Sequence, residues 1–168
     1  MLILTRLNNL LATVSYLIGI LIVAIMVMAL SLSAITRYIS GTGYDWLIEL
    51  PPVLVCWLVF PLLGPLLREG NHIQVDFLTS ITSDEQSKFL KLFMNLTALV
   101  ASLVFFKAGM DATFLYFNLG QMMELEIDIP IWWMYLSFPV GFMILASFSL
   151  ELTVQAFNDL KQEKTKGV

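Results

Sequence analysis

Charged residues are scarce in this chain. Asp, Glu, Lys and Arg make up 13% of its 168 residues, whereas hydrophobic residues make up 58%. A soluble domain has about 25% charged residues and at most about half apolar ones. The mean hydropathy of +0.83 agrees with this comparison. These values exclude an ordinary soluble domain. The sequence has no basic cluster that would indicate nucleic-acid binding.

The chain also lacks the residues that usually hold a metal or a redox group. It contains one cysteine, Cys56, and one histidine, His72. A lone cysteine excludes an intrachain disulfide, and packing within an apolar run is its expected role. His72 has no second histidine for a bis-histidyl haem and no nearby cysteines for zinc. We therefore expect no metal and no cofactor, and a hydrogen-bonding role for His72 in a loop.

Recognisable enzyme motifs are absent as well. There is no Ser-His-acid arrangement at usable spacing, no phosphate-binding glycine loop and no metal motif. The acidic triplet Glu124, Glu126 and Asp128 lacks the glycine-containing loop of an EF-hand, so we interpret it as a solvated edge rather than a calcium site. The sequence predicts a protein that is not an enzyme and has no catalytic, substrate-binding or metal-binding residues.

The chain does have four long apolar runs. Each is close to the roughly 20 residues with which an α-helix crosses the hydrocarbon core. The first run is longer than a signal-peptide core and no small-residue cleavage site follows it, so we expect it to remain a membrane helix. The predicted fold is an all-α integral membrane protein with a single membrane domain, 1–168. Its predicted spans are 14–35, 47–67, 91–117 and 130–152, followed by a polar C-terminal tail, 153–168.

The connections between the runs carry turn signals. Gly41 and Gly43 favour a chain reversal, because glycine tolerates positive φ. Four prolines in the second run predict a kinked helix. Apolar residues within 68–88 cluster on one side of a helix, which predicts an interfacial helix in the middle loop. Residues 119–129 alternate in the manner of an extended strand, and Pro130 suits the start of the fourth helix.

Lys and Arg are distributed unequally between the two predicted sides of the membrane. The side that holds both termini and the middle connection carries Arg6, Arg68, Lys88, Lys91, Lys161, Lys164 and Lys166, whereas the other side carries Arg37. Lys and Arg concentrate in cytoplasmic loops. Both termini and the middle loop are therefore predicted to be cytoplasmic, and the acidic segment 124–128 is predicted to lie outside.

Lys107 and Asp111 lie one helical turn apart within the third span, with Asn118 on the same face. A charge at the centre of a membrane helix costs about 2.5–3.5 kcal/mol on insertion scales, so we expect the two to neutralise each other and to face protein or water. Lys before Asp is the weaker order for a pair four residues apart. We therefore favour contact with a partner helix; a proton or substrate relay is the alternative.

Arg37, Asp45 and Glu49 form a second polar group, at the outer ends of the first two spans, where Trp46 would sit at the interface. We interpret this group as a structural ion-pair clamp rather than a chemical site. The candidate partner-interface or structural polar residues are therefore Arg37, Asp45, Trp46, Glu49, Arg68, His72, Lys107 and Asp111.

Several motifs resemble those of one transporter family. They are Arg37-Tyr38, Gly43-Tyr44-Asp45-Trp46-Leu47-Ile48-Glu49, Trp57-Leu58-Val59-Phe60, Ile129-Pro130-Ile131-Trp132-Trp133 and Phe138-Pro139-Val140-Gly141. The most specific segment reads Arg68, Gly70, His72, Ile73, Val75 and Asp76. Over nearly its whole length the chain resembles the small, DctQ-like membrane subunit of tripartite ATP-independent periplasmic (TRAP) transporters. It departs from the family where Leu50 follows Glu49, a position at which a second acid is common.

The resemblance implies a bacterial inner-membrane protein that works with a large permease subunit and a periplasmic solute-binding protein. An ion gradient, usually sodium, would drive uptake of an organic acid such as a C4-dicarboxylate or sialic acid. In that family the large subunit carries the substrate and ion sites and moves like an elevator, so the small subunit is implied to be a static scaffold among membrane lipids. We hypothesise that the loops 37–46 and 121–128 help to dock the binding protein. A small subunit of another tripartite carboxylate transporter and a self-contained small oligomeric transporter stay open as alternatives.

Overall fold

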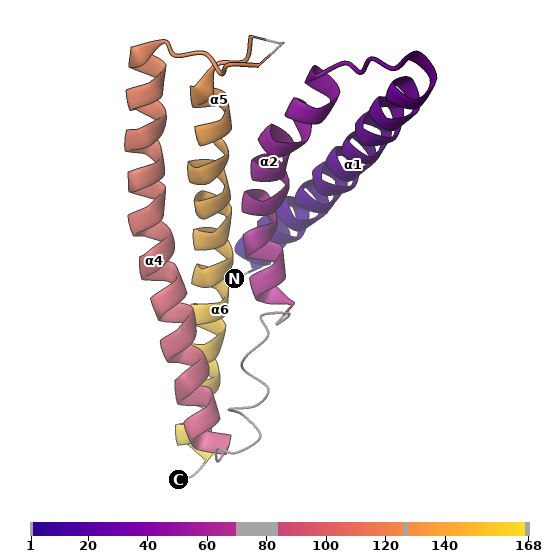
Figure 1. The fold of residues 1–168 in the computed structure, drawn as a ribbon. Helices are drawn as coiled ribbons and strands as arrows, with labels where there is room; N and C mark the ends of the chain where they lie inside the picture. Colours follow the sequence, from indigo (N-terminus) through magenta and orange to yellow (C-terminus); the bar gives the residue numbers. More distant parts are fainter. Residues whose placement is uncertain (1, 70–83, 126–127, 167–168) are drawn as a thin grey trace.

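The computed structural model describes residues 2–69, 84–125 and 128–166, and this part of the chain is helical apart from short connections. Its helices are α1 (Leu2–Ser40), α2 (Trp46–Arg68), α4 (Asp84–Leu119), α5 (Ile131–Tyr135) and α6 (Ser137–Lys166). Figure 1 shows α4 running alongside α6, with α2 next to α6 and α1 crossing behind α2.

Four helical segments are long and apolar enough to cross a membrane: Ile3–Ser40, Trp46–Arg68, Phe89–Leu119 and Ile131–Asn158. The last of these segments contains α5 and the first part of α6. This finding confirms the predicted all-α fold with four membrane-length helices. The helices extend beyond the apolar runs. Residues 2–13 and 153–166 continue α1 and α6 because they are rich in Leu, Lys, Gln, Glu and Ala, which are good helix formers outside the bilayer as well. The predicted interfacial helix, with His72, falls largely on residues 70–83, outside the described residues.

The helix α6 lies at the centre of the bundle, against α4 on one side and α2 on the other. Its contact with α2 depends on Gly141, where a Cβ atom would lie 2.5 Å from the backbone of Phe60. Such close approach is the usual reason for small residues in packed membrane helices. Phe148, which is fully buried, and Ile144 fill the core nearby.

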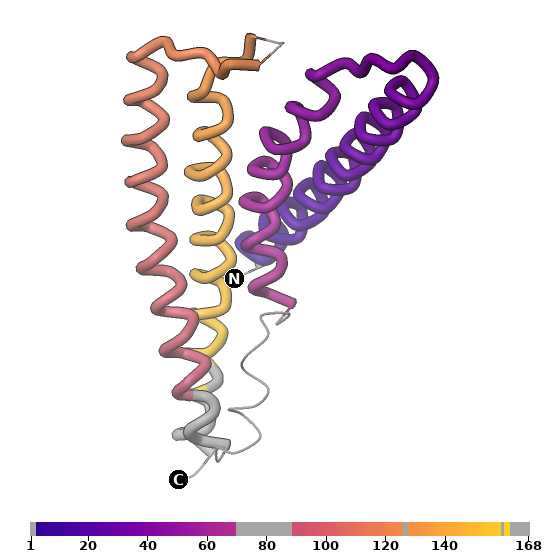
Figure 2. The backbone as a smooth tube through the Cα atoms, viewed as in Figure 1, coloured from indigo at the N-terminus to yellow at the C-terminus, as the bar shows by residue number. Residues whose placement is uncertain are grey.

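The second helix contains all four prolines of the second apolar run, Pro51, Pro52, Pro61 and Pro65. Figure 2 shows that the path of α2 is bent rather than straight, as expected of a helix that lacks several backbone donors. Pro51, Pro61 and Pro65 are buried, so neighbouring helices cover much of the interrupted backbone.

One end of the bundle, here called the connector end, holds the α1–α2 and α4–α5 connections (Figure 1). Gly41 has a φ of 69°, which confirms the predicted reversal there. Between α4 and α5 the chain doubles back in an isolated antiparallel bridge between Met122 and Pro130, with Met123 N donating to Ile129 O at 2.9 Å. Of the extended stretch predicted for 119–129, the described residues therefore show this isolated bridge and no strand. The opposite end, where α1 begins and α2 and α6 end, is called the terminal end.

Candidate functional site

Lys107 and Asp111 are exposed on α4. Neither makes a hydrogen bond or an ion pair with another residue in the described ranges, so the prediction that they neutralise each other is wrong. Lysine before aspartate is the weaker order for a pair four residues apart, so the geometry of the helix alone does little to hold the two side chains together.

The opposite face of α4 is fixed against α6. Ser102 and Thr113 are buried there, and a Cβ atom on Gly109 would lie 3.0 Å from Pro139 Cδ. Lys107 is about 200° around the helix axis from Gly109 at 100° per residue. The close contact at Gly109 thus sets the rotation of α4 and directs Lys107 and Asp111 away from the rest of the chain.

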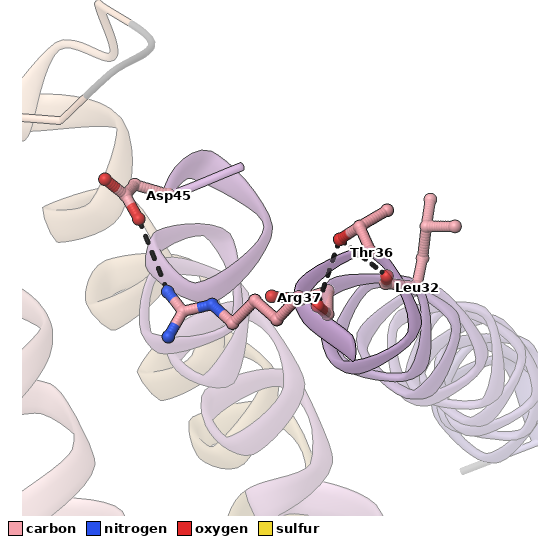
Figure 3. Close-up of polar contacts among 5 residues, drawn as sticks. Leu32, Thr36, Arg37 and Asp45 are labelled. Carbon is pink, nitrogen blue, oxygen red and sulfur yellow. Dashed lines mark hydrogen bonds and ion pairs between the residues drawn. The ribbon is translucent and has the colours of Figure 1, made fainter. Parts of the chain in front are cut away.

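At the connector end the structure brings together two members of the predicted clamp. Arg37 Nη2 lies 3.4 Å from Asp45 Oδ1 (Figure 3). The two side chains are 53% and 74% exposed, so solvent screens their attraction and the pair contributes little to stability. Figure 3 also shows the Thr36 hydroxyl donating to Leu32 O at 3.0 Å, a bond within α1 that does not join the clamp.

The other two predicted residues of this end lie beneath the loop before α5. Trp46 and Glu49 line a small cavity together with Leu50, Leu125 and Ile129. Glu49 is half-buried in the first turn of α2, where the helix dipole favours a negative charge. This arrangement brings the first turns of α2 next to Leu125 and Ile129 of the connection before α5.

Aromatic side chains join the helices at the connector end. Trp57 Nε1 donates to Trp133 O at 3.2 Å, and the two rings lie 5.4 Å apart. Phe117 packs edge-on against Trp132, with ring centroids 5.6 Å apart. These contacts connect α2 to α5 and α4 to α5.

The terminal end contains a buried polar cluster that the sequence analysis missed. Asn8 is fully buried and Glu151 is 1% exposed. Asn8 Nδ2 donates to Glu151 Oε2 at 2.6 Å, and Ser147 Oγ donates to Asn8 Oδ1 at 2.6 Å. Gln155 Nε2 donates to the second carboxylate oxygen, Glu151 Oε1, at 3.3 Å. An acid within the predicted fourth span was the available signal, by the same rule that singled out Asp111.

Two further bonds tie α1 to the end of α2. Arg68 Nη1 donates to Asn9 Oδ1, and the Tyr16 hydroxyl donates to Glu69 Oε1. Arg68, one of the predicted polar residues, is therefore a structural link between helices. His72 lies outside the described residues. Within the described ranges, no group of His, Cys, Asp or Glu could hold a metal ion.

Comparison with known protein families identifies the chain. The family model for the DctQ component of tripartite ATP-independent periplasmic transporters matches residues 26–159. That family is a transporter component rather than an enzyme family, and its members associate with the other components of a tripartite complex. No curated protein matches the chain closely enough to count as a relative. The match covers most of the sequence and agrees with the four membrane-length helices, so this chain is a multi-pass membrane protein that belongs to the DctQ family of TRAP transporter components.

Proposed function

We propose that the chain is the static scaffold subunit of a TRAP transporter in a bacterial inner membrane. A large elevator-type permease subunit carries the substrate and ion sites, and a periplasmic solute-binding protein delivers the substrate. The cargo is an organic acid such as a C4-dicarboxylate or sialic acid, taken up with an ion gradient in which sodium is the expected coupling ion. The chain itself performs no chemical reaction and binds no cofactor.

The observation that carries the scaffold role is the way in which α6 is locked to its neighbours. The close contact at Gly141 holds α6 to α2, and the one at Gly109 holds α6 to α4. The hydrogen bonds that Asn8 makes with Glu151 and Ser147 hold it to α1. Close contacts of this kind keep neighbouring helices from sliding past one another. A moving element needs such sliding, so the contacts suit a fixed frame against which a partner moves.

The charge distribution supports an orientation with both termini in the cytoplasm. At the terminal end the described residues include Arg6, Arg68 and Lys161, whereas the connector end has Arg37 beside the exposed acids Asp45, Glu124 and Asp128. Cytoplasmic loops are enriched in Lys and Arg. The connector end would then face the periplasm, where the binding protein docks on loops 37–46 and 121–128.

Affinity purification of the tagged chain from native membranes in a mild detergent tests the proposal. We expect a large polytopic permease to be recovered in about equal amount, and deletion of the chain to abolish uptake that depends on the binding protein. Recovery of the chain alone, as a defined homo-oligomer that transports after reconstitution, would instead establish a self-contained transporter. Recovery with a permease of a different tripartite carboxylate system would reassign the complex.

A further inference from the structure

Of the four membrane-length helices, α4 is the least buried within the described part of the chain. In the most apolar window of Phe89–Leu119, 6% is buried, against 22–28% in the other three membrane-length helices. Leu103, Val104 and Phe114 are exposed there by 55–61% of their surface. Apolar side chains suit lipid and protein equally well. The charged side chains of Lys107 and Asp111 on this outward face do not suit lipid, so they distinguish a protein environment from a lipid one.

By its place along α4, Lys107 would lie too deep in a bilayer for its ammonium group to reach water. We take the contact between Phe117 and Trp132 as the aromatic level at the connector end. Ten residues of helix separate Lys107 from Phe117, which is about 15 Å at 1.5 Å per residue and half of the roughly 30 Å hydrocarbon core. A lysine side chain does not span that distance. Asp111, about 9 Å from the same level, has a side chain that is shorter still.

Charges at this depth normally face protein or water and have partners there. Within the described part of the chain, Lys107 and Asp111 have none. Rotation of α4 does not bury them, because Gly109 holds the other face against Pro139. The described part of the chain therefore leaves both charges without a counter-charge, which a neighbouring molecule in the membrane would supply.

We infer that this face of α4 is the docking surface for a membrane-spanning helix of the large permease subunit. That helix places a carboxylate opposite Lys107 and a cation or hydrogen-bond donor opposite Asp111. The inference rests on the proposed function, since it takes the large subunit as the partner.

A second copy of this chain is a poor occupant of the same face. Subunits related by a two-fold axis along the membrane normal present equivalent residues at equal depth. With the axis passing through this face of α4, Lys107 would lie opposite Lys107, and Asp111 opposite Asp111. Like charges placed opposite each other across an interface are unfavourable, so the charges favour a partner with a different sequence.

Photocrosslinking in native membranes tests the docking surface. A benzoylphenylalanine replaces Val104 in the complete complex, and the matched control replaces Val27 of α1, which has nearly the same exposure, 58% against 61%. We expect the Val104 position to form an adduct with the large subunit in several-fold higher yield than the Val27 position. An equal yield from Val27, an adduct with a second copy or no protein adduct at all would overturn the inference.

A charge variant tests the chemistry of the partner. Lys107 makes no hydrogen bond or ion pair that Lys107→Met would break within the described part of the chain, so the variant should accumulate in the membrane at least as well as the wild type. We expect its recovery of the large subunit to fall about tenfold or more, because the partner's buried carboxylate loses its counter-charge. Lys107→Arg should restore recovery, and Leu103→Met, on the same face, should leave it unchanged.

The two proposals fail in different ways. If the wild-type chain does not recover a large permease, the proposed function is wrong. The other case is that the wild type and Lys107→Met recover the large permease in equal amount and that Val104 gives no adduct. The large subunit then docks elsewhere on this chain, and only the assignment of α4 is overturned.

Discussion

Asn8 and Glu151 are 143 positions apart in the sequence, yet Asn8 Nδ2 donates a 2.6 Å hydrogen bond to Glu151 Oε2. Both side chains are buried, and Ser147 Oγ donates to the carbonyl oxygen of the Asn8 amide. The cluster therefore satisfies the carboxylate with neutral donors. It joins the first turns of α1 to the middle of α6.

Removal of Asn8 should destabilise the bundle. Asn8→Ala leaves the Glu151 carboxylate buried with one fewer donor, which costs about 1–3 kcal/mol. We expect a lower unfolding temperature of the purified chain in detergent, measured by thermal denaturation. Asn118→Ala, which changes an exposed amide that has no partner in the described ranges, is the control and should have no effect.

The coupling between Asn8 and Glu151 can be measured with a double-mutant cycle. Since Glu151→Ala removes the carboxylate that Asn8 solvates, the double variant should lose less stability than the sum of the two single variants. Strictly additive losses would show that the two side chains act independently and would contradict the direct bond.

Gly141 should tolerate no side chain. Gly141→Ala places a methyl group 2.5 Å from the backbone of Phe60, so α2 and α6 have to separate, at a cost of about 1–3 kcal/mol. Gly19→Ala is the matched control in α1, because its methyl group meets the flexible Leu62 side chain at 3.3 Å. We expect the Gly19 variant to elute as monodisperse protein in size-exclusion chromatography. The Gly141 variant should give little or no monodisperse protein. Equal yields would argue against the close α2–α6 contact.

The sequence predicted the fold better than the polar sites. Four apolar runs of bilayer length were sufficient to predict the four membrane-length helices. Gly41 was sufficient to predict the first turn. The true helix lengths were not predictable from hydropathy, because polar residues such as those after Glu151 continue a helix outside the bilayer. The cluster at Asn8 was missed because it depends on which helices pack together, and apolar runs do not specify that. Lys107 and Asp111 do not form the expected pair with each other, and their contact with a partner stays a prediction.

Arg37 offers a way to separate stability from docking at the connector end. Because its ion pair with Asp45 is exposed, Arg37→Ala should change the free energy of unfolding by less than about 1 kcal/mol. If loop 37–46 docks the binding protein, the same variant should still reduce uptake at limiting binding-protein concentration. Thermal denaturation and uptake by proteoliposomes measure the two effects. Unchanged uptake at every binding-protein concentration would remove Arg37 from the docking surface.

The orientation of the bundle can be tested by labelling cysteines from one side of the membrane. Tyr44, 57% exposed at the connector end, and Lys161, exposed beyond the last apolar window of α6, are replaced one at a time by cysteine. Cys56, the native thiol, is first changed to Ala so that it does not react. With both termini in the cytoplasm, a membrane-impermeant maleimide should label Tyr44→Cys in intact cells and Lys161→Cys only after the inner membrane is opened. The reverse pattern would invert the bundle and move the acidic loop 121–128 to the cytoplasm, where no periplasmic protein could dock on it.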